Sequence, residues 1–139
     1  MAQHRTVPAL FPPPGYAHTA VVEAGERLVF LAGGVPLDAA GELVGPGDPV
    51  AQAHQVLANL ETALASVGSS LDRVVASTVY VVADRPGPLS TVWDVVDASA
   101  LHDGPHTSTL LGVSTLGYTG QLVEITVTAV VPEPPAVEG

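Results

Sequence analysis

The clearest alternation of hydrophobic and polar residues lies near the end of the chain, over residues 122–131. Successive side chains of a strand point to opposite faces. One face would carry Val123, Ile125, Val127, Ala129 and Val131. The other would carry Leu122, Glu124, Thr126, Thr128 and Val130. The first face is expected to pack against helices, whereas the half-polar second face suits a subunit interface or a wet cavity.

A helical period follows Asp48 and Pro49, which together are typical of a helix start, with Asp as the N-cap and Pro at the first helical position. Steps of three and four residues then place one apolar stripe along about five turns. The stripe consists of Val50, Ala53, Leu57, Leu60, Leu64 and Val67. Gly68 is expected to end this helix. A second, shorter helix is predicted over 90–101, with Ser90 as its cap, after a Pro/Gly turn at 84–89.

Runs rich in β-branched residues predict the other strands. These runs are 19–23 and 27–32, joined as a hairpin, then 71–82 and 107–113. The loop 36–49 is expected to hold a short strand around Leu43. The whole order predicts an α+β fold in one domain over 1–139, with a mixed sheet of about six strands and both helices on one face. Proline-rich stretches at about 1–15 and 132–139 predict irregular arms.

The composition indicates an aliphatic core and an oligomer. Hydrophobic residues make up 47% of the 139 residues, yet there are only one Trp, two Phe and three Tyr. Charged residues are 13%, against about a quarter in typical soluble domains. A monomer with so few charges would have difficulty covering its surface with polar groups, so we expect several copies to assemble.

The charge balance excludes several partners. Fourteen acids stand against four arginines and no lysine, which gives a net charge of −10. Nucleic-acid binding needs a basic surface, so neither DNA nor RNA is an expected partner. No apolar run approaches the roughly 20 residues that span a bilayer, and the proline-broken N-terminus does not resemble a secretory signal. No membrane partner and a cytoplasmic location are therefore expected. The absence of cysteine rules out disulfides, thiolate metal sites and thiol nucleophiles.

Five stretches of the chain share their order and spacing with a known family. They are GYAHTA at 15–20, LAGGVPLDAAGELV at 31–44, NLETALASVG at 59–68, VVASTVYV at 74–81, and the hydroxyl residues followed by GV and VEI within 107–125. Together they make residues 15–131 resemble the RidA/YjgF family of reactive-intermediate deaminases. The resemblance implies a chorismate-mutase-like fold and a homotrimer whose sheets form a central barrel with ligand clefts between subunits. It also implies hydrolysis of imines and enamines without metal or cofactor.

The same resemblance implies a set of site residues. Tyr16 would lie at the cleft rim, Gly33 would offer its backbone, and Glu124 would position the attacking water. A hydroxyl from the run at 107–109 and Leu110 would line the cleft. Trp93 stands where many members carry an asparagine, and as pocket wall or core it would face the same region.

The chain departs from the family pattern at the arginine that grips the substrate carboxylate. Counting back from the VEI motif places Ser108 at this position, whereas counting forward from Pro105 places Thr107 there. A hydroxyl offers one neutral donor in place of a bidentate, charge-assisted pair. The loss should weaken binding of an amino-acid-derived substrate on the order of 10²-fold. The ligand is therefore not expected to be a small 2-imino acid held by its carboxylate.

Glu124 and the histidines leave alternatives open. A carboxylate in a strand is costly to desolvate, so Glu124 either faces water or does chemistry. His106 and His18 could supply the missing cation or a proton relay, or could be loop residues satisfied by water. The other histidines, at positions 4, 54 and 102, show no ligand spacing, and no metal site is expected. Ser108 has no His-Asp arrangement around it, which argues against a covalent nucleophile.

Two functions fit the sequence. The first is a RidA-like protein that binds a small metabolite in inter-subunit clefts and hydrolyses, or otherwise turns over, an imine- or enamine-type intermediate with Glu124 and water. The second is a catalytically silent trimer that binds a metabolite in a regulatory or protective role. The missing arginine favours the second for standard substrates, and the retained Glu124 favours the first with a different substrate.

Overall fold

The computed structural model describes residues 2–104 and 106–133. The strands in this part are β1 (Gln3–Arg5), β2 (Thr19–Val21), β3 (Arg27–Phe30), β4 (Val74–Val82), β5 (Thr107–Val113) and β6 (Val123–Val131). The α-helices in it are α1 (Pro49–Ala65) and α2 (Pro86–Asp97). Two 3₁₀ turns, η1 (Leu71–Arg73) and η2 (Ala100–His102), precede β4 and β5 respectively.

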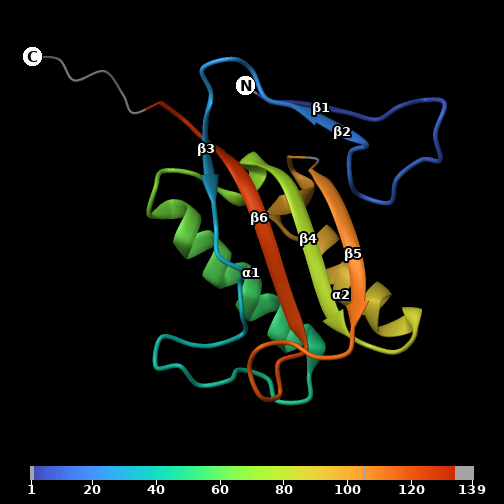
Figure 1. Ribbon diagram of the computed structural model, residues 1–139, viewed down its shortest axis with the longest axis vertical. Helices are drawn as coiled ribbons and strands as arrows, with labels where there is room; N and C mark the ends of the chain where they lie inside the picture. The colour runs from blue at the N-terminus through green and yellow to red at the C-terminus, as the bar shows by residue number, and fades with distance from the viewer. Residues whose placement is uncertain (1, 105, 134–139) are drawn as a thin grey trace, which may run out of the picture.

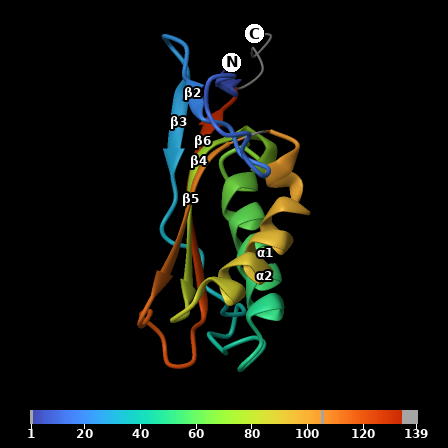
Figure 2. The same ribbon diagram turned by 90° about the vertical axis from the view of Figure 1, so that its right-hand side faces the viewer.

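The main sheet has four strands in the order β3-β6-β4-β5 (Figure 1). Strand β6 runs antiparallel to both β3 and β4, whereas β4 and β5 are parallel and are connected through α2. Both helices cover the same face of this sheet, and the other face is left open (Figure 2). The predicted α+β class with helices on one face is confirmed, as is the chorismate-mutase-like fold.

The core forms between α1 and the middle of the sheet. Val123, Ile125, Val127 and Ala129 of β6 are buried, as the alternation predicts. They face the buried stripe of α1, which consists of Ala53, Val56, Leu57, Leu60 and Leu64. The ends of the predicted stripe are wrong, because Val50 and Val67 are 36% and 43% exposed. Gly68 follows the helix at a φ of +79°, in agreement with its predicted role at the helix end.

The predicted hairpin over 19–32 is wrong. Strand β2 pairs with β1 in a separate two-stranded sheet, while β3 pairs with β6. Gly25, at a φ of +86°, turns the chain between β2 and β3 and separates their directions. The N-terminal arm is therefore not wholly irregular, since it contains β1. At the other end, Pro132 and Glu133 have no regular structure, and residues 134–139 lie outside the described part.

Three predicted boundaries also change. The second helix begins at Pro86 and not at Ser90, because a proline has no N–H to lose in the first helical turn. The central strand begins at Val74, after the 3₁₀ turn η1. Leu43 forms an isolated bridge with Leu37 and no strand. None of the helices over residues 2–104 and 106–133 has the length and apolar character to cross a bilayer.

Candidate functional site

The predicted site residues divide between the two faces of the main sheet. Ser108 and Leu110 of β5 pair with Ser77 and Val79 of β4, which are both buried on the helix side. Glu124 of β6 pairs with Tyr80 of β4. Because Tyr80 is an odd number of positions from Ser77 and Val79, its side chain points to the open face. The two groups are therefore not brought together within one copy of the chain.

On the helix side, a cavity of about 440 Å³ opens between the N-terminal arm, α2 and β5. We call it the arm cavity. Four of the predicted residues line it, namely Tyr16, Trp93, Ser108 and Leu110. Pro14 of the arm and two residues of α2, Ser90 and Asp94, complete the lining. This volume lies in the range of small-molecule sites.

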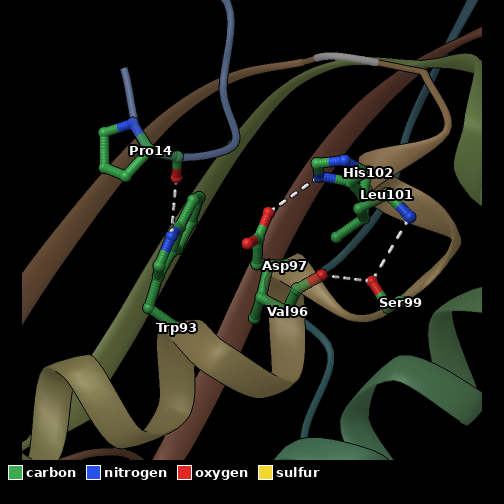
Figure 3. Close-up of polar contacts among 7 residues, drawn as sticks. All are labelled: Pro14, Trp93, Val96, Asp97, Ser99, Leu101 and His102. Carbon is green, nitrogen blue, oxygen red and sulfur yellow. Dashed lines mark hydrogen bonds and ion pairs between the residues drawn. The ribbon is translucent and has the colours of Figure 1, made fainter. Parts of the chain in front are cut away.

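Trp93 ties the arm to α2. Its indole Nε1 donates a hydrogen bond to the Pro14 carbonyl oxygen at 2.9 Å (Figure 3). The Tyr16 ring meets the indole edge to face, with ring centroids 6.3 Å apart. Next to them, Gly15 has a φ of +88°, a conformation that favours glycine, and a Cβ there would also meet the Asp97 carboxylate. The rings that wall the cavity are thus held in fixed positions.

His18 fastens the base of the arm. Its Nδ1 accepts a hydrogen bond from the Val7 backbone N–H at 2.8 Å, and its Nε2 lies 3.0 Å from the Phe11 carbonyl oxygen. A backbone amide can only donate, so Nδ1 carries no proton and Nε2 is the donor to Phe11. The interpretation of His18 as a loop histidine satisfied by water is therefore wrong, since both its nitrogens bind the protein.

His106 lies behind Trp93 and not in the cavity. It is 1% exposed, and its ring centroid is 6.2 Å from that of Trp93. Among the described residues, neither of its ring nitrogens reaches a hydrogen-bond partner. Burial lowers the pKa of His106, although the nearby Leu101 backbone opposes this shift. His106 does not line the arm cavity, and its burial and lowered pKa both argue against a role as a cation there. It is not a solvated loop residue either.

The structure decides which hydroxyl faces the arm cavity. Ser108 lines it, and the Ser108 hydroxyl lies 2.8 Å from that of Ser77. Thr107 does not line the cavity, and its hydroxyl donates to the Val75 carbonyl oxygen at 2.9 Å. Ser108 is therefore the position at which a longer side chain would reach into the cavity.

On the open face, the Glu124 carboxylate is held by Gln121 and Gly33. Its Oε1 accepts a hydrogen bond from Nε2 of Gln121 at 3.1 Å. A Cβ on Gly33 would lie 2.7 Å from Oε2, so the carboxylate rests directly against the glycine backbone. Gln121 is 3% exposed and is itself fixed, because it also donates to Val123 and accepts from the Tyr118 N–H. Glu124 and Gly33 thus form a second half-site, held by a neutral amide.

Sequence reasoning missed the amides that support this half-site. Gln52 is fully buried in α1, donates to the Gly45 and Gly120 carbonyls, and accepts the Leu122 N–H at 2.7 Å. Asn59 donates to two carbonyls of the loop that follows Gly33, both at 2.8 Å. The sequence feature that could have identified Gln52 is its place beside the apolar stripe of α1, where a residue packs against the sheet and a buried polar group needs hydrogen-bond partners.

A larger hollow of about 700 Å³ lies at the end of the sheet near β1 and η1. Its lining includes charged residues of both signs, among them Arg27, Arg73, Asp72 and Asp103, but none of the predicted site residues. Over residues 2–104 and 106–133, no group of three or more His, Asp or Glu side chains is arranged to hold a metal ion.

Comparisons with known proteins agree with the fold. Residues 9–131 match the family described as Endoribonuclease L-PSP. A Rid-family protein of unknown function from Yersinia pestis, YyfB, is 32% identical, with a TM-score of 0.86 over 94% of this chain and 98% of that one. Rv2704 of Mycobacterium tuberculosis, a member of the YjgF/YER057c/UK114 family, is 25% identical, with a TM-score of 0.63 over 94% and 100% of the two chains.

A sequence match to Protein DfrA of Myxococcus xanthus is 40% identical over 65 residues. This match spans 47% of the present chain and about half, 49%, of that protein.

Proposed function

The chain belongs to the L-PSP family, the family of the Rid and YjgF proteins. From this premise we propose that it hydrolyses a C=N bond of a small metabolite in clefts between copies of the chain. Glu124 would be the catalytic residue. The observation that carries the proposal is the setting of this carboxylate, which rests on the Gly33 backbone and accepts a hydrogen bond from the buried amide of Gln121. A carboxylate fixed in this way can receive a proton from water without first reorganising its surroundings.

The proposed reaction needs only water and the substrate. Glu124 takes a proton from water while the water oxygen bonds to the imine carbon, and the C=N π electrons move onto nitrogen. The protonated Glu124 then returns its proton to the nitrogen of the tetrahedral intermediate. Glu124 next takes the remaining hydroxyl proton and passes it to the departing nitrogen as the C–N bond breaks. Ammonia leaves and a carbonyl compound remains, so an imine and one water become a ketone or aldehyde and one ammonia.

A complete site requires a second copy of the chain, because the arm cavity and Glu124 lie on opposite faces of the sheet. The open face also carries exposed apolar side chains, with Leu28 41% and Phe30 75% exposed. A groove of about 160 Å³ beside Phe30 is bordered by Thr78, Thr126 and Thr128. A face of this kind suits an interface, and we propose a homotrimer. Light scattering at micromolar concentration should give three times the chain mass, and a monomer would contradict the composite site.

The family description also names an endoribonuclease. The charge of −10 argues against RNA as the substrate here, because phosphate binding needs arginines or lysines and the chain has only four arginines. None of the four lines the arm cavity. A catalytically silent metabolite-binding protein is the second candidate. It is supported by one observation, the absence of a basic side chain from the lining of the arm cavity.

The decisive experiment measures ammonia release from 2-iminopropionate and 2-iminobutyrate generated in situ. We expect the wild type to be inactive, Ser108→Arg to be active, and Ser108→Arg with Glu124→Gln to be inactive again. Equal activity with and without Glu124→Gln would remove Glu124 as the catalyst. Ready turnover by the wild type would contradict the carboxylate argument.

The composite site can be tested by mixing variants. Ser108→Arg carrying Glu124→Gln supplies an intact arm cavity, and Trp93→Ala supplies an intact Glu124. If each site takes one half from each of two copies, refolding the two proteins together should restore part of the activity that both lack alone. Activity that does not recover in verified mixed trimers would mean that each copy uses its own Glu124.

A further inference from the structure

The lining of the arm cavity has an unusual balance of charge. Among the seven lining residues, Asp94 carries a negative charge at neutral pH and none carries a positive one. Two rings, those of Tyr16 and Trp93, line the cavity side by side in edge-to-face contact, with centroids 6.3 Å apart. Leu110 and Pro14 add apolar surface, and Ser90 and Ser108 are the neutral hydroxyls. Such a lining cannot compensate the negative charge of a carboxylate ligand.

A ligand in the arm cavity can contact Trp93 only through its ring. Because its single N–H is already bonded to the Pro14 carbonyl oxygen at 2.9 Å, the indole has no donor left for a ligand. The remaining surface of the indole is its π system, which is negative on the face and attracts cations within about 6 Å. The Tyr16 ring adds a second aromatic wall at nearly a right angle, 78°. The two rings are in edge-to-face contact with each other, so a flat ligand would stack on the aromatic surface that lines the cavity, and a cationic ligand would be stabilised by it.

The cations of the chain lie elsewhere. Arg85 is 3.5 Å from Asp84 in the turn before α2, and Arg5 donates to Gln3 on β1. Arg27 and Arg73 line the separate 700 Å³ hollow. A neighbouring copy that contributed its open face would add another carboxylate, Glu124, and not a base. The field at the site is therefore negative from its own lining and from the remainder of the composite site.

We propose that the arm cavity selects a flat or aromatic ligand that carries a positive charge, an amine or the corresponding iminium, and that it rejects carboxylates. This inference rests on the proposed function only in treating the cavity as the ligand site of the composite cleft. It identifies the substrate class as imines derived from amines rather than from amino acids. Trp93 and Tyr16 determine specificity, and Asp94 at the rim assists them.

The experiment is a binding measurement that needs no turnover. Trp93 is the only tryptophan of the chain, so its fluorescence reports directly on occupancy of the cavity. Three probes of similar shape differ in charge: benzylamine is cationic at pH 7, benzyl alcohol is neutral and benzoate is anionic. We expect benzylamine to bind about three- to thirtyfold more tightly than benzyl alcohol, the range of a cation–π contact, and benzoate to bind most weakly.

Two substitutions test the assignment. Asp94→Asn should weaken benzylamine by about two- to fivefold, as for an exposed ion pair, and should leave benzyl alcohol unchanged. Glu61→Gln is the matched control, because it removes the same charge from an exposed position on α1 that does not line the cavity. Ser108→Arg should reverse the order, so that benzoate binds more tightly than benzylamine.

The outcomes separate this inference from the proposed function. Equal or tighter binding of benzoate by the wild type would overturn the inference, and so would the absence of any fluorescence response to all three probes. Either result leaves the Glu124-dependent ammonia release by Ser108→Arg as an independent measurement. Conversely, the expected order of probes together with no Glu124-dependent turnover would uphold the charge selectivity and overturn the hydrolytic function.

Discussion

Replacing Gln52 with methionine should destabilise the protein by about 2–4 kcal/mol, even though the new side chain has nearly the same length. Gln52 is fully buried and makes three hydrogen bonds to backbone groups, at 3.1, 3.0 and 2.7 Å. A neutral hydrogen bond contributes about 1 kcal/mol net, and an unpaired buried group costs about 1–3 kcal/mol. The carbonyl of Gly120, an exposed residue, can bind water instead, whereas the Leu122 N–H is half-buried. Three lost bonds with partial rehydration give the stated range.

Urea unfolding at a fixed protein concentration measures this loss. With a slope of about 2 kcal/mol per molar urea, the midpoint should fall by about 1–2 M. Gln55→Met is the matched control, since Gln55 lies on the same helix and makes one side-chain bond, to Asn59 at 2.9 Å. It should cost less than about 1 kcal/mol. If the two variants lose the same stability, Gln52 does not fix the loops around Gly45 and Gly120.

Three further predictions concern other parts of the molecule. Burial lowers the pKa of His106 below its ordinary 6.5. The unfolded chain therefore binds a proton first as the pH drops through 6.5, and the stability of the folded protein falls. His106→Leu should reduce this fall in urea midpoints measured from about pH 8 to about pH 5. Asp48→Ala removes two N-cap bonds of 3.1 Å and should cost about 1 kcal/mol by the same assay. Gly33→Ala should displace the Glu124 carboxylate and abolish ammonia release in the Ser108→Arg background, whereas Gly87→Ala, whose Cβ would meet nothing within 4 Å, should not.

The elements that could be predicted are those whose pattern is local. The alternation of β6 is complete within nine residues, and the five residues that it assigns to the core face are all buried, although Val130 of the opposite face is buried as well. The stripe of α1 likewise needs only the helical period: Ala53, Leu57, Leu60 and Leu64 are buried as predicted, whereas Val50 is exposed and Val67 lies beyond the end of the helix at Ala65. The pairing of β3 with β6 could not be obtained in this way, because it depends on partners about a hundred residues apart in the chain.

The division of the candidate site between two faces also depends on nonlocal register. Whether Ser108 and Glu124 share a face is decided by their partners in β4, Ser77 and Tyr80, whose side chains point in opposite directions. The β5 sequence alone does not show to which face of the sheet the Ser108 side chain points. The burial of His106 was missed for a related reason, since a histidine after a proline is typical of a loop, and its burial depends on partners such as Trp93 that are distant from the local pattern.

The two candidate half-sites, the arm cavity and the Glu124 carboxylate, are held by different parts of the fold. The arm cavity depends on the hydrogen bond from Trp93 to Pro14 and on the His18 contacts. Glu124 depends on Gln121 and, through the neighbouring backbone, on Gln52 of α1. No side chain is shared between these two sets of contacts. Substitutions in the arm cavity can therefore change which ligand is bound while the carboxylate keeps its position, and we expect ligand selectivity and water activation to respond to mutation independently.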